Sequence, residues 1–320
     1  LDADMENARV LFDRSVRLAA HDFLDQVEER AASRQLRDVF GGLDLDSRRT
    51  RAYEAAESTH AWLGDPARGG RGAPDIVVIV DETGKAIARN GARNVMLGKA
   101  LTSSMPALAT ALQRGVAIHD VWQEDEQNKI LQTAIAPIRS EQGTLLGALV
   151  VGYDLSNGFA TAESKLLGRD VAFIVDNKVY GSSLDGAAAR DLKGYLFGAG
   201  KAGTQAVLAG QANTSPAFKV SLGGDEYSAL TSRLPMAASV PVAFSVLGNR
   251  TKATQLASTA NVILVLLAVG VLLVLGYGFV IGNAIMRPIE RIEEGVLAVI
   301  NGRTDLRLET DNTELGGLAL

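Results

Sequence analysis

The feature that most constrains this chain is an uncharged stretch near its C-terminal end. From Ala253 to Met286 there is no Asp, Glu, Lys, Arg or His, and the centre of the stretch, Val262–Ile281, is strongly apolar. About 20 apolar residues, each rising about 1.5 Å in a helix, cross a hydrocarbon layer of about 30 Å. A buried helix of a soluble protein is the alternative, but such long helices normally keep a polar face. The sequence therefore predicts a transmembrane helix, which we assign to residues 250–283.

A second helical pattern begins directly after this stretch, at Arg287-Pro288. Its apolar residues recur at alternating spacings of four and three, which is typical of a coiled-coil seam. Asn301-Gly302 ends the predicted helix, and a short charged connector leads to a second helix start at Thr313. The seam consists of Ile285, Ile289, Ile292, Val296 and Val299.

This arrangement resembles the HAMP domain, the signal relay of bacterial transmembrane receptors. The matching features are the proline after the span, the seamed helix, the glycine that follows it, and Glu314-Leu315-Gly316 at the start of the next helix. Thr313 stands where many members carry an acidic residue, which weakens one helix cap. A plain juxtamembrane coiled coil is the alternative. The resemblance implies an incomplete HAMP domain over residues 284–320 and a parallel homodimer. Its expected signal-relay residues are Pro288, Ile289, Ile292, Val296 and Glu314.

Composition excludes several kinds of partner and chemistry. Of the 320 residues, 47% are hydrophobic and 22% are charged, so most of the chain is expected to fold. A formal net charge of -5 argues against a nucleic-acid partner. The absence of cysteine excludes disulfides, thiol catalysis and cysteine-ligated metal. Because receptors with a large outer domain usually have a span before it, we expect one upstream of Leu1 and an output domain beyond Leu320.

The N-terminal region, residues 1–73, is predicted to be a helical stalk. Residues 1–40 are predicted to form one long helix, because their apolar residues recur at helical spacings until Gly41-Gly42. A second helix is expected over Ser47–Leu63, and the glycine- and proline-rich residues 64–74 form a loop. A helix of about 40 residues reaches about 60 Å, enough to run along two stacked small domains. An ordinary amphipathic helix packed on one domain is the alternative.

Two strand-rich segments follow, and the second echoes the first. Ile79-Val80-Asp81 resembles Ile174-Val175-Asp176, and Val151-Gly152-Tyr153-Asp154 resembles Val246-Leu247-Gly248-Asn249 at the same offset. A shared offset suggests a duplicated module. The elements predicted in the first segment are strands Ile76–Asp81, Lys85–Arg89, Ala117–Gln123, Lys129–Ile138 and Leu145–Tyr153 with helix Pro106–Arg114. Helix Asn157–Leu167 is predicted to connect to helix Ala187–Phe197 and strands Phe218–Leu222, Tyr227–Leu234 and Val242–Leu247.

The whole pattern resembles the double Cache sensors of bacteria, which are PAS-like extracellular ligand-binding domains. The resemblance rests on the architecture and on strand phrases such as Val78–Ala86 and Thr133–Asp154. It implies an α+β fold: a long N-terminal helix, a membrane-distal Cache module (74–160) and a membrane-proximal one (161–249), each with an antiparallel sheet, before the span and the partial HAMP unit. The aromatic–arginine–aspartate pattern of the amino-acid- and amine-binding subfamily is not found, so no ligand class is carried over.

Candidate ligand-binding residues lie in the first strand-rich segment. PAS-like folds hold ligands between the sheet and its covering helices and loops, and Asp120 and Trp122 share one strand face by alternation. Arg89 could bind a ligand carboxylate through its fork, and Trp122 could cover an apolar part. Tyr153 and Arg93 are weaker additions. The alternative is an edge-strand salt bridge and a core aromatic.

No catalytic, metal or cofactor motif is found, so we expect no enzyme activity, metal site or cofactor in this chain. There is no phosphate loop, kinase motif or Gly-x-Ser-x-Gly setting. The histidines His21, His60 and His119 lie in different predicted elements with no ligand spacing. The acidic run from Glu124 to Glu126 is interpreted as a solvated hairpin turn.

These patterns together predict a transmembrane signal-transduction receptor of the bacterial inner membrane. Its periplasmic part would bind a small molecule, and the span and HAMP helices would relay the signal to a cytoplasmic histidine kinase, chemotaxis transducer or nucleotide cyclase. The alternatives are a membrane-anchored adhesion or structural protein without a ligand, and an anchored ectoenzyme.

Overall fold

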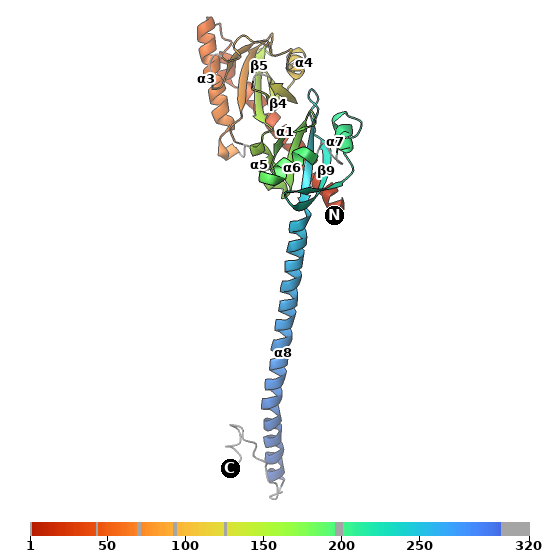
Figure 1. The fold of residues 1–320 in the computed structure, drawn as a ribbon. Helices are drawn as coiled ribbons and strands as arrows, with labels where there is room; N and C mark the ends of the chain where they lie inside the picture. The colour runs from red at the N-terminus through yellow and green to blue at the C-terminus, as the bar shows by residue number, and fades with distance from the viewer. Residues whose placement is uncertain are drawn as a thin grey trace. The chain divides into compact units, whose positions relative to one another are not determined.

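The computed structural model begins with a long helix, α1 (Asp2–Ala31). The structure describes residues 2–42, 44–68, 72–91, 95–124, 127–195 and 201–301. Two units are distinguished, Leu1–Thr251 and Lys252–Leu320, and each is described by itself. The first unit contains α1 and two five-stranded sheets (Figure 1).

The single helix predicted over residues 1–40 is wrong at its C-terminal end. The chain leaves the helix at Ser33, which is extended (φ -68°, ψ 149°), and a short helix α2 (Arg34–Asp38) follows. This break allows Leu36 and Val39 to join the core beneath the first sheet, where both are fully buried. The helical spacing of apolar residues continues from α1 into α2, although the chain changes direction between the two helices. The spacing alone therefore could not reveal the break.

The next helix, α3 (Leu45–Leu63), begins at a capping aspartate. The Asp44 side chain accepts hydrogen bonds from the amides of Asp46 and Ser47, both at 3.0 Å, which satisfies two of the free donors at the helix start. The helix ends at Gly64 and a short 3-10 turn, η1 (Pro66–Arg68), follows. Small residues on the buried face of α3 allow close packing on the sheet. They include Ala52, Ala55 and Ala56.

The first sheet is antiparallel, with strand order β2-β1-β5-β4-β3. One face is covered by α1, α2 and α3, and the other by α4 (Pro106–Arg114) and the segment before it (Figure 1). Because both faces are covered, the central strands are apolar without interruption. The strands are β1 (Ile76–Asp81), β2 (Ala86–Arg89), β3 (Ile118–Glu124), β4 (Lys129–Arg139) and β5 (Leu145–Asp154).

The second sheet has the same strand order, β7-β6-β10-β9-β8. Helices α1 and α5 (Asn157–Leu167) cover one face, and α6 (Gly186–Tyr195) and α7 (Lys201–Leu208) cover the other. The strands are β6 (Asp170–Val175), β7 (Lys178–Ser182), β8 (Phe218–Leu222), β9 (Asp225–Arg233) and β10 (Val242–Asn249). The repeated topology confirms the α+β fold of two antiparallel sheets that the sequence predicted, although β7 and α7 were not predicted.

The register of the repeat differs from the prediction by one residue at one end. The bulge after Ile79 in β1 corresponds to the bulge after Phe173 in β6, so Ile79 matches Phe173 rather than Ile174. Ile79 and Phe173 both face α1, whereas Ile174 faces α7. The match of Val151 with Val246 keeps both residues on the α1 face and is therefore correct. A shift of one residue reverses the sheet face, which a short sequence echo does not detect.

Helix α1 packs against both sheets. Its N-terminal half contributes Phe12 and Val16 to the core of the second sheet, and the Phe12 ring lies 4.2 Å from that of Phe244. Its C-terminal half contributes Phe23 and Val27 to the core of the first sheet. A single helix therefore supports both sheets of the unit.

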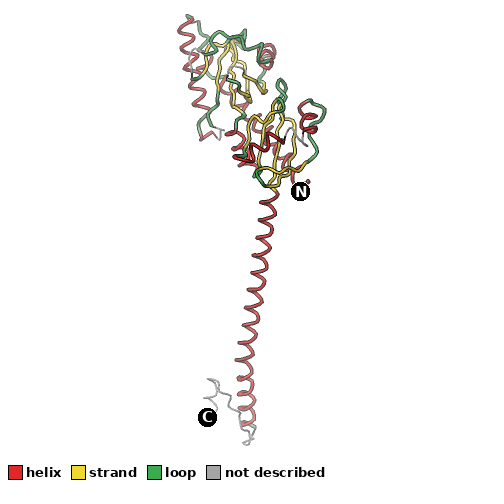
Figure 2. Tube along the Cα trace, in the orientation of Figure 1, coloured by secondary structure: helices red, strands yellow, loops and turns green. Residues whose placement is uncertain are grey.

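The last element is the helix α8 (Arg250–Ile300), which is uninterrupted in Figure 2 and passes through Pro288. Within it, Ile263–Asn283 is long and apolar enough to cross a membrane, with mean hydropathy 2.8. Its side chains from Ile263 to Ile281 are exposed, in contrast to a core helix. Glu314 and the predicted second HAMP helix lie outside the described residues.

Candidate ligand sites and the contacts that join the sheets

Three of the predicted ligand residues lie on the same face of the first sheet. Arg89 stands opposite Val78, and Trp122 stands opposite Leu131, in rows of side chains that face α4. Asp120 belongs to this face by alternation along β3. The shared face of Asp120 and Trp122 therefore agrees with the alternation of side chains predicted from the sequence.

The same residues lie at opposite edges of that sheet. Arg89 is on β2 and Asp120 and Trp122 are on β3, with β1, β5 and β4 between these two outer strands. At about 4.8 Å per strand, the two edges are roughly 19 Å apart. A small ligand could reach both only by lying across the sheet beneath α4.

Arg89 is a buried cation. Its side chain is 8% exposed, its Nε donates to the Asn90 carbonyl oxygen at 3.2 Å, and its Nη1 lies 3.9 Å from the Met96 sulfur. Among the residues that the structure describes, no carboxylate pairs with it. A buried guanidinium without an anion is unfavourable, so this position is suited to an anionic group.

Trp122 is a buried aromatic with an unused donor. It is 2% exposed and packs among apolar side chains beneath α4, such as Leu108 and Ile135. Its indole Nε1 is buried and finds no acceptor in the described part of the chain. Because buried donors are normally paired, a ligand oxygen would satisfy this group.

Asp120 binds the loop between β9 and β10, residues 234–241. Its Oδ1 accepts hydrogen bonds from the amides of Ala238 at 2.8 Å and Ser239 at 3.1 Å, and its Oδ2 accepts one from the Ser239 hydroxyl. The carboxylate is 3% exposed. Asp120 therefore connects the edge of the first sheet to the second sheet, a contact between residues far apart in the sequence that no local pattern indicates.

Tyr153, predicted to share the site, lies on the opposite face of the sheet. Its ring packs edge-on against Phe23 of α1, with centroids 5.1 Å apart, and its hydroxyl donates to the Gly72 carbonyl oxygen at 3.0 Å. Tyr153 pairs with Gln132, which pairs with Val121, so strand alternation separates it from Trp122. Arg93, the fifth predicted residue, lies outside the described residues.

A second connection between the sheets is centred on Tyr180 of β7. Its hydroxyl donates to Asp154 Oδ1 at 2.6 Å and accepts a hydrogen bond from the Ile130 amide at 3.0 Å. Burial and the hydrogen bond to Asp154 raise the pKa of Tyr180 to about 12. Burial also raises the pKa of Asp154, although the bond from Tyr180 opposes this shift. The pair therefore holds a neutral phenol against a half-buried carboxylate.

The start of α8 is attached to the second sheet. Thr251 accepts a hydrogen bond from the Glu226 amide at 3.0 Å, and Asn249 donates to Asp225 Oδ2 at 3.0 Å. Because β10 continues directly into α8, both ends of β9 are connected to elements that could transmit a displacement. The β9–β10 loop contacts the first sheet, and the Asp225 end contacts the first turn of α8.

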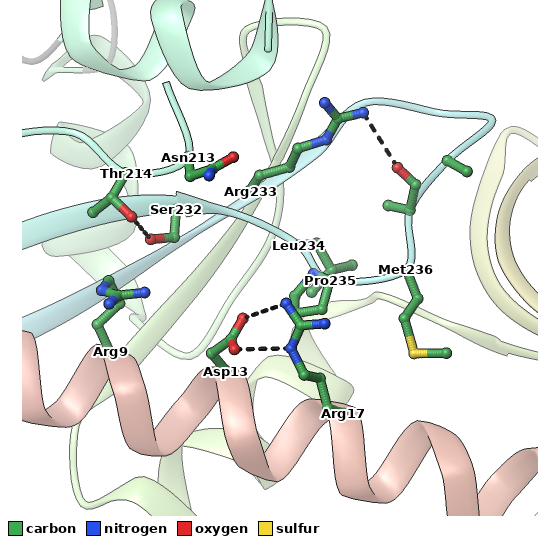
Figure 3. A pocket seen from close by; sticks show the side chains of 12 residues that line it. Arg9, Asp13, Arg17, Asn213, Thr214, Ser232, Arg233, Leu234, Pro235 and Met236 are labelled. Atoms are coloured by element: carbon green, nitrogen blue, oxygen red, sulfur yellow. Dashed lines mark hydrogen bonds and ion pairs between the residues drawn. The ribbon is translucent and has the colours of Figure 1, made fainter. Parts of the chain in front are cut away.

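A cavity that the sequence did not predict lies between α1 and the end of β9 (Figure 3). Its volume is about 420 Å³. In Figure 3, Arg9, Asp13 and Arg17 extend from successive turns of α1 toward β9. The other walls are Asn213, Thr214, Ser232, Arg233, Leu234, Pro235, Met236, Ala237 and Ala238. These residues come from distant parts of the chain, so no sequence signal identified them.

A smaller cavity, of about 330 Å³, lies at the beginning of α4. Its lining includes Ser103 and Ser104 from the turn before α4, Gln123 from β3 and Ser239 from the β9–β10 loop. No group of His, Cys, Asp and Glu side chains suited to holding a metal ion occurs among the described residues. The chemistry available at these sites is binding through arginine, hydroxyl and indole donors.

Residues 75–238 match the family model dCache_3, described as the double sensory domain of two-component sensor kinase. The match covers just over half of the chain and includes strands of both sheets. The chain belongs to this double Cache family. The family is a sensory module, which agrees with the predicted resemblance and with a sensory receptor role for this double Cache chain.

Solved structures similar to this double Cache chain include two sensor domains from Vibrio cholerae. The sensor domain of the histidine kinase DctB has 14% identity and a TM-score of 0.47, covering 78% of this chain and 97% of that chain. The periplasmic domain of LuxQ has 13% identity and a TM-score of 0.49, covering 78% and 99%. No curated protein matches the sequence.

A chemoreceptor domain is also similar. The ligand-binding domain of the Pseudomonas aeruginosa amino acid chemoreceptor PctB, in complex with L-Arg, has 13% identity and a TM-score of 0.42. The match covers 81% of this chain and 92% of that chain. The family assignment rests on the family model and not on these structures.

Proposed function

We propose that this chain is the sensing and membrane-crossing part of a receptor that binds a small molecule in the periplasm. The observation that carries the proposal is the buried face beneath α4, where the Arg89 guanidinium has no carboxylate partner and the Trp122 indole has no acceptor among the described residues. A buried guanidinium without a carboxylate and a buried indole N–H without an acceptor suit a polar ligand bearing a carboxylate. The description of the matched family as sensory supports this role.

Ligand binding would be transmitted through the hydrogen bonds between the sheets. Asp120 lies two residues from Trp122 on β3 and holds the β9–β10 loop. A shift of this edge strand would therefore reach β9 and β10, and then the first turn of α8 through Thr251. Packed elements of this kind have few discrete arrangements, so a small shift can select between two of them.

The remaining parts of the proposal concern the membrane and the output. Residues up to about 255 would lie in the periplasm, Ile263–Asn283 would cross the inner membrane, and residues from 284 would form a HAMP relay in a parallel homodimer. The modules would divide at residues 74–160 and 161–249, after the helical stalk of 1–73. The family description favours a two-component system, with a histidine kinase as the output, over a chemotaxis transducer or a nucleotide cyclase.

A thermal-shift screen of small metabolites on the purified chain tests the ligand site. A ligand that binds only the folded state raises the melting temperature. Arg89→Ala and Trp122→Ala should each abolish the shift produced by a confirmed ligand. Arg114→Ala, at the exposed end of α4, and Trp62→Phe, on α3, serve as matched controls that should keep it. If both site variants respond as the unchanged protein does, the ligand does not bind beneath α4.

A further inference from the structure

Strand β3 forms an outer edge of the first sheet. It pairs with β4 on one side, and no second strand pairs with it in the described part of the chain. Along an antiparallel pair, positions whose backbone N–H and C=O bond to the partner strand alternate with positions whose groups point away from it. The second kind of position on β3 therefore presents unpaired backbone groups at the edge of the sheet.

Gln123 occupies such an outward position. It stands opposite Ile130 of β4. The Ile130 amide donates to the Tyr180 hydroxyl at 3.0 Å, and the Ile130 carbonyl oxygen accepts from the Leu155 amide at 2.9 Å. Because both backbone groups of Ile130 are directed elsewhere, the N–H and C=O of Gln123 point away from β4 and are open at the edge.

Val121, two residues earlier, has the same orientation by alternation. Its N–H is already used, because it donates to Asp120 Oδ1 at 2.8 Å. Its carbonyl oxygen is left open at the edge. The acceptor of Val121 and the donor and acceptor of Gln123 therefore follow one another at the spacing of a β-ladder, the order in which the main chain of an extended peptide can pair.

This edge opens into the cavity at the beginning of α4, whose volume is about 330 Å³. The lining includes Val121 and Gln123 but not Trp122 between them, as expected where alternate positions face outward. None of the lining residues that the structure describes is charged, so a neutral occupant is favoured over an ion. The other walls are Ser103, Ser104, Met105, Pro106, Ser239 and Val240.

The β9–β10 loop closes one end of the open edge. Asp120 Oδ1 accepts the outward N–H of Val121 and also the Ser239 amide, at 3.1 Å, so the loop lies against the edge at this point. A longer strand of another protein would need the place that the loop occupies. Three residues of extended chain span about 10 Å, so the open edge and its cavity suit a short peptide.

We propose that the edge of β3 binds a neutral peptide of about three residues as an added antiparallel strand, at a site separate from the one beneath α4. The peptide residue opposite Gln123 donates to its carbonyl oxygen and accepts from its N–H, and the residue two positions further on donates to the Val121 carbonyl oxygen. The occupant also touches Ser239, which bonds to Asp120. Binding therefore acts directly on the connection between the two sheets.

Calorimetric titration of the full chain in detergent micelles tests the proposal, with N-acetyl-trialanine amide as the probe in the millimolar range. The peptide should bind. Its analogue with N-methylated alanines, which keeps the carbonyls but lacks the alanine amide hydrogens, should bind about tenfold more weakly or worse. Hydrogen exchange gives a direct measurement, because the Gln123 N–H should exchange more slowly when the peptide is present.

Two pairs of variants locate the peptide. Gln123→Pro removes the open donor without removing a ladder bond and should weaken binding about tenfold, whereas Gln123→Ala keeps the donor and should weaken it less than about threefold. Ser103→Trp places a bulky ring at the exposed rim of the cavity and should block binding. Ala109→Trp, at an exposed position of α4 outside the lining, is its matched control and should bind as the unchanged chain does.

The proposal is overturned if the peptide does not bind, if the N-methylated analogue binds as tightly, or if the Gln123 N–H exchanges equally with and without peptide. Unchanged binding by the folded Gln123→Pro protein would overturn it as well. If Gln123→Pro does not fold, Ser103→Trp decides, and unchanged binding there has the same consequence. Loss of peptide binding in Arg89→Ala with retention in Ser103→Trp would place the peptide beneath α4 and likewise overturn it.

Discussion

Asp120 of β3 and Ser239 of the β9–β10 loop are joined through both the amide and the hydroxyl of the serine. The carboxylate also accepts the amide of Ala238, so one buried side chain holds consecutive residues of a loop that belongs to the other sheet. Such a contact limits how far either sheet can move alone. It is the point at which stability and signal transmission are expected to be coupled.

Replacing this carboxylate should destabilise the first unit. Asp120→Ala removes the acceptor of three inter-sheet bonds and leaves amides of Ala238 and Ser239 without it, which should lower the free energy of unfolding by about 2–3 kcal/mol. Urea denaturation of the full chain measures this. Glu141→Ala, in an exposed turn, is the control and should change stability by less than about 0.5 kcal/mol. Equal midpoints for the two variants would show that the Asp120 contacts add nothing to stability.

The Tyr180 phenol should make stability depend on pH in the alkaline range. Its pKa is about 12 in the folded protein against 10.0 ordinarily, so the folded state holds the proton more tightly. The resulting stabilisation is complete below pH 10 and is lost as the pH rises through about 12. Tyr180→Phe lacks this contribution, so the difference in unfolding free energy between the two proteins should be smaller at about pH 11 than at about pH 8. A difference that stays constant would contradict the assignment.

The same variant should change the titration of Asp154. Burial raises the pKa of this carboxyl, and the hydrogen bond from Tyr180 partly opposes the rise. Tyr180→Phe removes the opposing bond, so the pKa of Asp154 should rise further. Carbon NMR of the labelled carboxyl group measures it. An unchanged or lower pKa in the variant would show that the phenol does not stabilise the ionised form.

Two glycines should respond oppositely to alanine. A Cβ at Gly147 of β5 would collide with the Val80 carbonyl oxygen and the Phe40 ring, so Gly147→Ala should cost about 2–3 kcal/mol. At Gly158 in α5 a Cβ would meet only the Ser156 hydroxyl, at 3.7 Å. Gly158→Ala should therefore stabilise by up to about 1 kcal/mol. Thermal unfolding followed by circular dichroism compares them, and a tolerated Gly147→Ala would show that the backbone there can move apart.

The orientation of the chain in the membrane can be tested with protease. Asp65, Pro66 and Ala67 are exposed, and the 64–74 loop to which they belong should be cut in intact spheroplasts if the first unit is periplasmic. Sites placed after residue 284 should be cut only after the membrane is permeabilised. Protection of the loop in intact spheroplasts would reverse the proposed orientation.

The proposed dimer predicts a face-specific cross-link. Ile289 belongs to the apolar seam and Glu290 does not, and both are exposed in the single chain. In membranes, Ile289→Cys should cross-link between two chains much more than Glu290→Cys, because a seam residue would lie near the symmetry axis. The experiment belongs in a chain that extends beyond residue 320. Equal cross-linking at both positions, or none at either, would remove the seam from the mechanism.

Local elements were determined by the sequence itself. Helix Pro106–Arg114 and strand Ile76–Asp81 have the predicted bounds, because proline at the helix start, glycine after its end and an uninterrupted apolar run act on neighbouring residues. The apolar part of α8 was equally evident, since about 20 uncharged residues need no tertiary partner to be recognised. The face shared by Asp120 and Trp122 followed from strand alternation, but their separation from Arg89 followed from strand order, which alternation does not contain.

Only the tertiary structure decided how distant residues meet. The break at Ser33, the bulge that shifts the repeat by one residue and the bonds of Asp120 to Ser239 all depend on packing between segments remote in sequence. The cavity between α1 and β9 is the clearest case, because its walls come from residues 9–17 and 213–238, which are remote from each other in the sequence. Side-chain periodicity records which face of an element is buried, whereas the partner of that face is selected by the free energy of the whole fold.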